Sequence, residues 1–455
     1  MAQSLIQQAL ATADQTRTIV LGEAVLDETG SVFADEFPGS RVLVVADENT
    51  FAAAGERVVA SLQTAGVPFA EAPFVFPGTP TLYAGYENVE ALREHLRPLA
   101  DTVVCSIASG SLNDIAKLAS GELGRPYMTV CTAASVDGYT AFGASIARDG
   151  FKITRDCPAP VAVVADVDVM AAAPPRLTAT GYGDLIEKVP AGADWLLADE
   201  LGIEPIDPDV WNLVQGPLRD ALAQPHLLAG ADPAEVAKLA EANLMSGLAM
   251  QAMQSSRPAS GAGHQFSHVW EMEGHGLDWE PPLSHGFKVG IGTIASCAIW
   301  EAALALDVDR VDVERLVAAA PSADELRRRC RQLLRPRIAE ASLPQALAKH
   351  RSGDDLRARI ELIIGHWPEI RRRCAPQLLA PQEVMDRLRA VGAPHHPSMI
   401  RMDWERFRIS HFKVPLIRSR YTVVDALADL GVFEDVVDGL FSPDGFWGRH
   451  ATPDA

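Results

Sequence analysis

Short apolar runs alternate with helical patterns in the first third of the chain. RVLVVAD at residues 41–47, TVVCSIASG at 102–110 and YMTVCTAAS at 127–135 are almost continuously apolar, and each ends in small or polar residues. Strands that are buried on both faces have this composition, and strands that alternate with helices form a parallel sheet. Amphipathic helical patterns lie at 50–64 and 86–98, and another begins just after the second run. This part of the chain is therefore predicted to be an open α/β sheet.

The pattern changes after the apolar run PVAVVADVDVMAAAPP. Long helical segments such as PAEVAKLAEANLMSGLAMQAMQSS follow, and strand patterns almost disappear. We therefore expect an α/β domain over residues 1–172 and an all-α domain over residues 173–455. No repeat of 20 to 50 residues is present, which excludes a solenoid.

Charge and cysteine content exclude several classes of protein. The chain has 60 acidic and 40 basic side chains, a formal net charge of -20, and such a surface repels nucleic acid. Its six cysteines form no CxxC pair, which indicates reduced thiols rather than a disulfide or zinc framework. The first residues do not resemble a signal peptide, and the apolar stretches are too short or too interrupted to span a membrane. We expect a cytoplasmic protein without a membrane segment.

The second apolar run leads directly into a helical pattern through a turn of small residues. In IASGSLNDIAK, this turn contains Ser109, Gly110 and Ser111. Ligands of open α/β sheets bind beyond the carboxyl ends of the strands, and the N–H groups at a helix N-terminus bind phosphate. The turn is therefore either a pyrophosphate site or only a tight connection between strand and helix.

Two further strand ends carry polar side chains. Asp47 ends the first run, and Thr132, Ser135 and Asp137 lie in CTAASVDGYT after the third. An acidic residue at the position of Asp47 either accepts hydrogen bonds from an adenosine ribose, which favours NAD over its phosphorylated form, or caps the next helix. The sequence leaves both roles open.

Three histidines lie close together between residues 255 and 290. They are His264, His268 and His285, and Asp184 stands upstream in the motif GYGD. Two histidines and one carboxylate fill three positions on a divalent cation and leave at least one open, as catalytic metal chemistry requires. The alternative is that these are ordinary core or surface residues and that GYGD is a glycine-rich helix entry.

Six motifs in this order carry a resemblance to a known family: SGSLNDIAK, TAASVDGYT, GYGDLIEK, ADW, SSRPASGAGHQFSH and HGFKVG. The sequence resembles the sn-glycerol-1-phosphate dehydrogenases, especially their bacterial branch. These belong to the superfamily of iron-containing alcohol dehydrogenases, glycerol dehydrogenases and dehydroquinate synthases. The resemblance implies a Rossmann-like dinucleotide-binding domain, an all-α metal-binding domain and an active site between them.

The resemblance also implies roles for individual residues. It assigns the metal to Asp184, His264 and His285. It assigns the dinucleotide to Ala108, Ser109, Gly110, Ser111, Leu112, Thr132 and Ser135, beside Asp47, which the strand-end pattern already proposes for the ribose. Substrate contacts fall to Asp137, Asp184 and His268, of which Asp137 and His268 are catalytic. Since histidine titrates near neutral pH, His268 is the expected proton relay.

Two residues depart from the family pattern. Ala108 stands where glycine is usual, and Ala141 stands where a serine is common. Neither change removes a group that the chemistry needs, although both bear on cofactor affinity. Arg257 and Lys288 lie near the histidines in sequence and are expected to face the phosphate of the substrate.

The implied reaction is the reversible reduction of dihydroxyacetone phosphate to sn-glycerol 1-phosphate. The implied cofactors are NAD(H) or NADP(H) and one divalent ion, zinc, nickel or iron, and the implied assembly is a homodimer or a higher homo-oligomer. Three alternatives remain open: a metal-dependent dehydrogenase of another small polyol or alcohol, a dehydroquinate-synthase-like carbon–oxygen lyase, and a nucleotide-binding protein without turnover. Asp at position 184 favours a dehydrogenase over the lyase.

Overall fold

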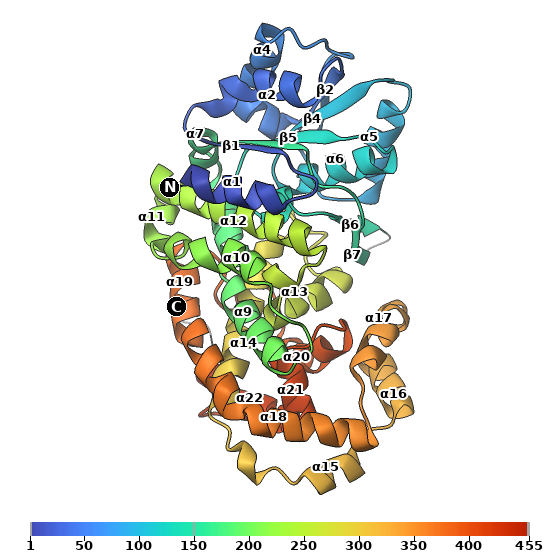
Figure 1. The fold of residues 1–455 in the computed structure, drawn as a ribbon, viewed down its shortest axis with the longest axis vertical. Coiled ribbons are helices and arrows are strands. Elements are labelled where there is room, and N and C mark those ends of the chain that lie inside the picture. The colour runs from blue at the N-terminus through green and yellow to red at the C-terminus, as the bar shows by residue number, and fades with distance from the viewer. Residues whose placement is uncertain (1, 149–150, 453–455) are drawn as a thin grey trace.

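The computed structural model describes residues 2–148 and 151–452. Figure 1 shows a sheet with its helices at one end of the molecule and a helical region at the other. The strands are β1 (Thr18–Gly22), β2 (Arg41–Asp47), β3 (Phe74–Phe76), β4 (Thr102–Ala108), β5 (Tyr127–Cys131), β6 (Ala144–Arg148), β7 (Phe151–Arg155) and β8 (Ala162–Asp166). Six of them form a parallel sheet in the order β1-β8-β5-β4-β2-β3, and β6 and β7 form a separate antiparallel pair.

Helices and short helical turns connect and cover the strands. They are α1 (Ala2–Thr12), η1 (Val25–Glu28), α2 (Thr29–Glu36), α3 (Glu48–Thr50), η2 (Phe51–Gly55), α4 (Glu56–Thr64), α5 (Tyr86–Leu96), α6 (Gly110–Glu122), η3 (Asp137–Tyr139) and α7 (Val167–Ala171). Residues of β2 alternate between two cores: Val42 and Val44 pack with α2 and α4, whereas Leu43 and Val45 pack with α5 and α6. Both faces of the sheet are therefore covered, which explains the continuous apolar runs.

The rest of the described chain is helical. It comprises α8 (Pro175–Leu185), α9 (Lys188–Glu200), α10 (Pro208–Ala221), α11 (Pro225–Ala229), α12 (Pro233–Met253), η4 (Arg257–Ala259), α13 (Ala262–Met272), α14 (His285–Leu304), η5 (Val308–Arg310), α15 (Val313–Ala319), α16 (Ala323–Leu333), α17 (Pro336–Lys349), α18 (Gly353–Cys374), η6 (Ala375–Gln377), α19 (Pro381–Ala390), η7 (Pro397–Ile400), α20 (Trp404–Lys413), η8 (Val414–Leu416), α21 (Val423–Asp429), α22 (Phe433–Phe441) and α23 (Phe446–Arg449). The predicted α/β fold with a helical second part is confirmed. The predicted boundary at 172 lies between α7 and α8 and stays a prediction.

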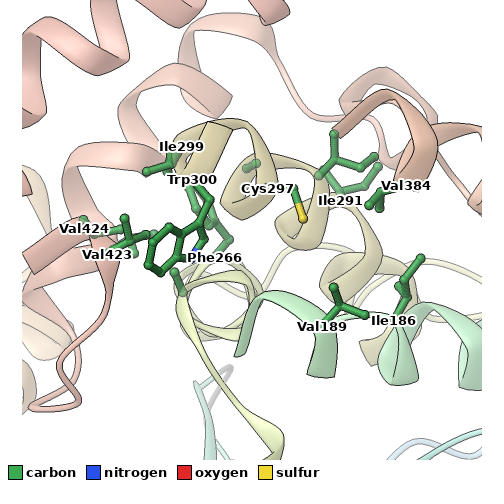
Figure 2. Close-up of a cluster of buried hydrophobic side chains, with 14 of the residues drawn as sticks. Ile186, Val189, Phe266, Ile291, Cys297, Ile299, Trp300, Val384, Val423 and Val424 are labelled. Carbon is green, nitrogen blue, oxygen red and sulfur yellow. The ribbon is translucent and has the colours of Figure 1, made fainter. Parts of the chain in front are cut away.

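Helix α14 forms the centre of the helical region. Figure 2 shows Ile291, Cys297 and Trp300 of this helix among apolar side chains from other helices. Within the part of the chain that the structure describes, α14 is the single helix long and apolar enough to cross a membrane, and 83% of its apolar window is buried. A helix that is apolar on all sides is typical of a protein core.

Candidate metal centre and cofactor cleft

Three helices bring the predicted metal ligands together. Asp184 lies in the last turn of α8, His264 in the first turn of α13, and His285 at the start of α14. One potential ligand atom from each residue lies within 4.8 Å of the other two. Asp184 Oδ1 is 3.3 Å from His264 Nε2, and the two imidazole centroids are 5.5 Å apart. The structure therefore gathers residues separated by about a hundred positions into one group.

Glycines allow these helices to approach so closely. A Cβ atom on Gly286 of α14 would lie 1.9 Å from the carbonyl oxygen of Thr180 on α8. A Cβ atom on Gly292 would lie 2.2 Å from the carbonyl oxygen of Gly263 on α13. Since no real Cβ tolerates such distances, glycine is required at both crossings for α14 to contact α8 and α13.

A carboxylate contacts the Nδ1 atom of each of the two histidines in the ligand group. Glu187 Oε2 accepts a hydrogen bond from His264 Nδ1 at 2.6 Å, and Glu271 Oε1 lies 2.9 Å from His285 Nδ1. Both carboxylates are buried. Such pairing puts the proton on Nδ1 and leaves Nε2 as the ring nitrogen able to bind a cation. The residues present therefore fit a metal ion, and Glu187 and Glu271 are residues beside the ligand group that the sequence reasoning missed.

Lys188 joins two acidic residues of the site. Its Nζ donates to Asp184 Oδ1 at 3.0 Å and to Asp137 Oδ2 at 2.9 Å, and Ser246 Oγ donates to the same Asp137 oxygen at 3.0 Å. Burial opposes the charge of Lys188, but the two carboxylates outweigh it and raise the pKa of the amine. Burial likewise opposes ionisation of Asp184, yet Lys188 and His264 hold its pKa well below the usual range. Asp184 is therefore ionised and able to bind a cation.

A cavity of about 530 Å³ runs from the carboxyl edge of the sheet to the histidines. At one end it is lined by Ser109, Gly110 and Ser111, where α6 begins without a side-chain cap. At the other end it is lined by His264, His268 and His285, and Ser135 and Asp137 lie along it. The open N–H groups of the first turn of α6 can bind an anion there.

The remaining predicted cofactor residues lie outside this lining. Ala108 and Leu112 are buried in the core beside the sheet, so only their backbone is available to a cofactor, and Thr132 is also buried. Ala141, the second departure from the family pattern, does line the cavity. Asp47 Oδ1 accepts from the N–H groups of Asn49 and Thr50, so the helix-capping role is realised. Its contact with a ribose stays a prediction.

His268 lies in the cavity but does not titrate as expected. Its Nδ1 is 3.4 Å from Glu271 Oε2, and its ring centroid is 6.1 Å from those of His264 and His285. Desolvation, reinforced by the charge of Arg418, lowers the pKa of His268 to about 3. The expectation of titration near neutral pH is therefore wrong, because the imidazole is neutral at that pH.

The two basic residues expected to face a phosphate behave differently. Arg257 is fully buried, donates to the carbonyl oxygens of Asp194 and Tyr421, and pairs with Glu204 at 3.0 Å. It supports the fold and does not line the cavity, so that expectation is wrong. Lys288 does line the cavity, with its Nζ 3.5 Å from Glu271 Oε1.

The fold and the ligand group define a class of protein. The sequence profile of the family described as iron-containing alcohol dehydrogenase matches residues 20–174. A solved 1,3-propanediol oxidoreductase superposes with a TM-score of 0.58 at 14% identity, covering 93% of this chain and 99% of the other. Glycerol dehydrogenase from Schizosaccharomyces pombe superposes with a TM-score of 0.57 at 14% identity, covering 97% and 94%. The fold is that of iron-type alcohol dehydrogenases.

Curated relatives narrow this class to one family. The glycerol-1-phosphate dehydrogenase (NAD(P)+) of Methanosarcina barkeri is 34% identical over 278 residues, which are 61% of this chain and 75% of the relative. The protein of the same name from Halalkalibacterium halodurans is 35% identical over 260 residues, which are 57% of this chain and 65% of the relative. The chain thus spans just under two thirds of the latter. The chain belongs to the glycerol-1-phosphate dehydrogenase family, as the motifs predicted.

Proposed function

We propose that this protein is a metal-dependent, NAD(P)H-linked enzyme that reversibly reduces dihydroxyacetone phosphate to sn-glycerol 1-phosphate. The observation that carries the proposal is the group of Asp184, His264 and His285 at the end of a cavity that begins at the sheet edge. Membership of the family supports the substrate. The protein acts in the cytoplasm as a homodimer or a higher homo-oligomer.

Asp184 and the Nε2 atoms of His264 and His285 would hold the divalent ion. Once bound, zinc, nickel or iron supplies a Lewis acid that polarises the substrate carbonyl. The chain itself prepares this site, because Glu187 and Glu271 each hold Nδ1 of one histidine and leave its Nε2 as the ring nitrogen that would bind the ion. Lys188 keeps the Asp184 carboxylate in place.

The dinucleotide, NAD(H) or NADP(H), would supply the hydride. Its pyrophosphate would bind at Ser109, Gly110 and Ser111, with backbone contributions from Ala108 and Leu112. Asp47 would hold the ribose, and Thr132 and Ser135 would line the nicotinamide half. The protein's part in this step is to orient the cofactor against the substrate and to exclude water.

Asp137 and His268 would contact the substrate directly. Asp137 is held by Lys188 and Ser246, so the carboxylate presents a fixed acceptor to a substrate hydroxyl. Neutral His268 would give a proton to the new alcohol from one ring nitrogen while the other, which faces Glu271, takes up a replacement proton from solvent. These roles orient the substrate and complete the reduction.

One assay tests the proposal. Metal-reconstituted protein is mixed with NADH or NADPH and dihydroxyacetone phosphate, and absorbance at the nicotinamide band is followed, with dihydroxyacetone and chelator-treated protein as controls. Metal-dependent oxidation that requires the phosphate, with sn-glycerol 1-phosphate as product, is the expected result. Absence of oxidation by protein that holds metal and NADH would reject it. Substrate turnover without net loss of NADH would instead indicate the lyase.

A further inference from the structure

Arg418 brings a cationic side chain into the cavity from a distant part of the chain. It follows η8, precedes α21 and lines the same cavity as His268 and Lys288. It acts electrostatically on His268 and is itself influenced by Glu271, so it lies near the metal end of the cavity. None of the six family motifs contains it.

Hydrogen bonds hold the backbone on the C-terminal side of Arg418. Ser419 N donates to Gln345 Oε1 at 3.1 Å, and Val423 N donates to Asp194 Oδ1 at 2.9 Å. The guanidinium of Arg420 donates to the carbonyl oxygen of Ser260 and to Ser256 Oγ, each at 2.9 Å. Arg418 therefore extends from a fixed segment, which lowers the entropy cost of binding a ligand.

The donors of Arg418 are uncommitted, unlike those of other basic groups nearby. In residues 2–148 and 151–452, Arg418 has no hydrogen bond or ion pair, although it is half-buried. Arg176, in the same cavity, donates to the carbonyl oxygen of Pro282 at 2.6 Å. Burial lowers the pKa of the Arg418 guanidinium. A poorly solvated cation with free donors gains strongly from an anionic partner.

The summed charge of the side chains around the site, together with a divalent ion, also favours binding of an anion. Four carboxylates and three cationic side chains surround the ligand group: Asp137, Asp184, Glu187, Glu271, Lys188, Lys288 and Arg418. These groups alone leave one negative charge in excess. A divalent ion at the site reverses this to one positive charge, which attracts an anionic group of the substrate.

We propose that Arg418 binds the substrate phosphate through its guanidinium fork and makes the site select a phosphorylated triose over the free triose. This inference rests on the proposed function and adds the residue that sets substrate specificity. Arginine suits this role because its planar donors match two phosphate oxygens at once, whereas lysine offers only a point charge.

The test compares R418A, R418K and R418Q with R372A, which removes an exposed arginine on α18 that does not line the cavity. Each metal-loaded variant is titrated calorimetrically with glycerol 1-phosphate and with glycerol, and its kcat and KM are measured with dihydroxyacetone phosphate and dihydroxyacetone. We expect R418A to weaken glycerol 1-phosphate binding and raise the KM for dihydroxyacetone phosphate by about tenfold or more. R418K should fall between R418A and the unchanged protein, and R372A should match the latter.

Two results would overturn the inference in distinguishable ways. If the unchanged protein prefers the phosphorylated ligands and R418A keeps that preference within about twofold, Arg418 is not the phosphate residue and the proposed function stands. If the unchanged protein shows no preference for phosphorylated ligands, both proposals fail. Should R418A lose its metal, R418Q decides, since it preserves most of the side-chain volume without the charge.

Discussion

Replacing Glu187 by glutamine tests how the protein prepares His264 for a metal ion. Glu187 Oε2 is 2.6 Å from His264 Nδ1, and Oε1 accepts from the N–H of Gly261 at 3.1 Å. The carbonyl oxygen of glutamine can keep the contact with Gly261. Its NH₂ group then faces Nδ1, which must become the acceptor, so the ring proton moves to Nε2.

That proton would occupy the atom that binds the metal. Removing such a carboxylate costs about 10- to 100-fold in metal affinity, or about 1.4 to 2.7 kcal/mol. We expect E187Q to lose affinity in this range while its circular dichroism spectrum is unchanged. Affinity is measured by competition with a chromophoric chelator, and bound metal by elemental analysis.

The chain offers a matched control for this variant. Glu200 Oε1 lies 2.8 Å from His366 Nδ1, the same kind of carboxylate–histidine pair, but neither residue belongs to the ligand group. E200Q should bind metal as tightly as the unchanged protein. If E187Q is folded and also binds metal with unchanged affinity, the Glu187 carboxylate does not decide which ring nitrogen of His264 carries the proton, and our reasoning fails.

Three further outcomes are expected. His264→Ala should remove a ligand and abolish both tight metal binding and turnover; a variant that keeps its metal and full activity would disprove the assignment. Burial lowers the pKa of His411 to about 4, so between pH 6.5 and 4 the unfolded state binds more protons and stability falls as the pH falls. His411→Phe should reduce that fall in the urea midpoint, and an equal dependence in both proteins would contradict the assignment. Gly286→Ala meets the carbonyl oxygen of Thr180 and should cost more than about 2 kcal/mol in urea unfolding, whereas Gly365→Ala, with open space, should cost nothing.

The sheet could be predicted because its information is local. Arg41–Asp47, Thr102–Ala108 and Tyr127–Cys131 are strands within a few residues of the predicted runs, and α6 begins at Gly110 as expected. The runs at 102–110 and 127–135 end earlier as strands, since their small and polar residues form the loops of the cavity. The short strand Phe74–Phe76 was not predicted, because three residues carry too little pattern.

In the candidate site, too, residue type and motif predicted some features, whereas others depend on tertiary contacts. Asp184, His264 and His285 could be proposed from residue type and motif, since metal binding needs particular side chains in a polar, glycine-bearing context. The state of His268 could not, because its low pKa comes from desolvation and from Arg418. The burial of Arg257 likewise could not be predicted from the sequence, since its partners Asp194, Glu204 and Tyr421 contact it only in the folded protein. Strand and helix patterns follow from neighbours in sequence, whereas the protonation and partners of a side chain follow from neighbours in space, which packing alone assigns.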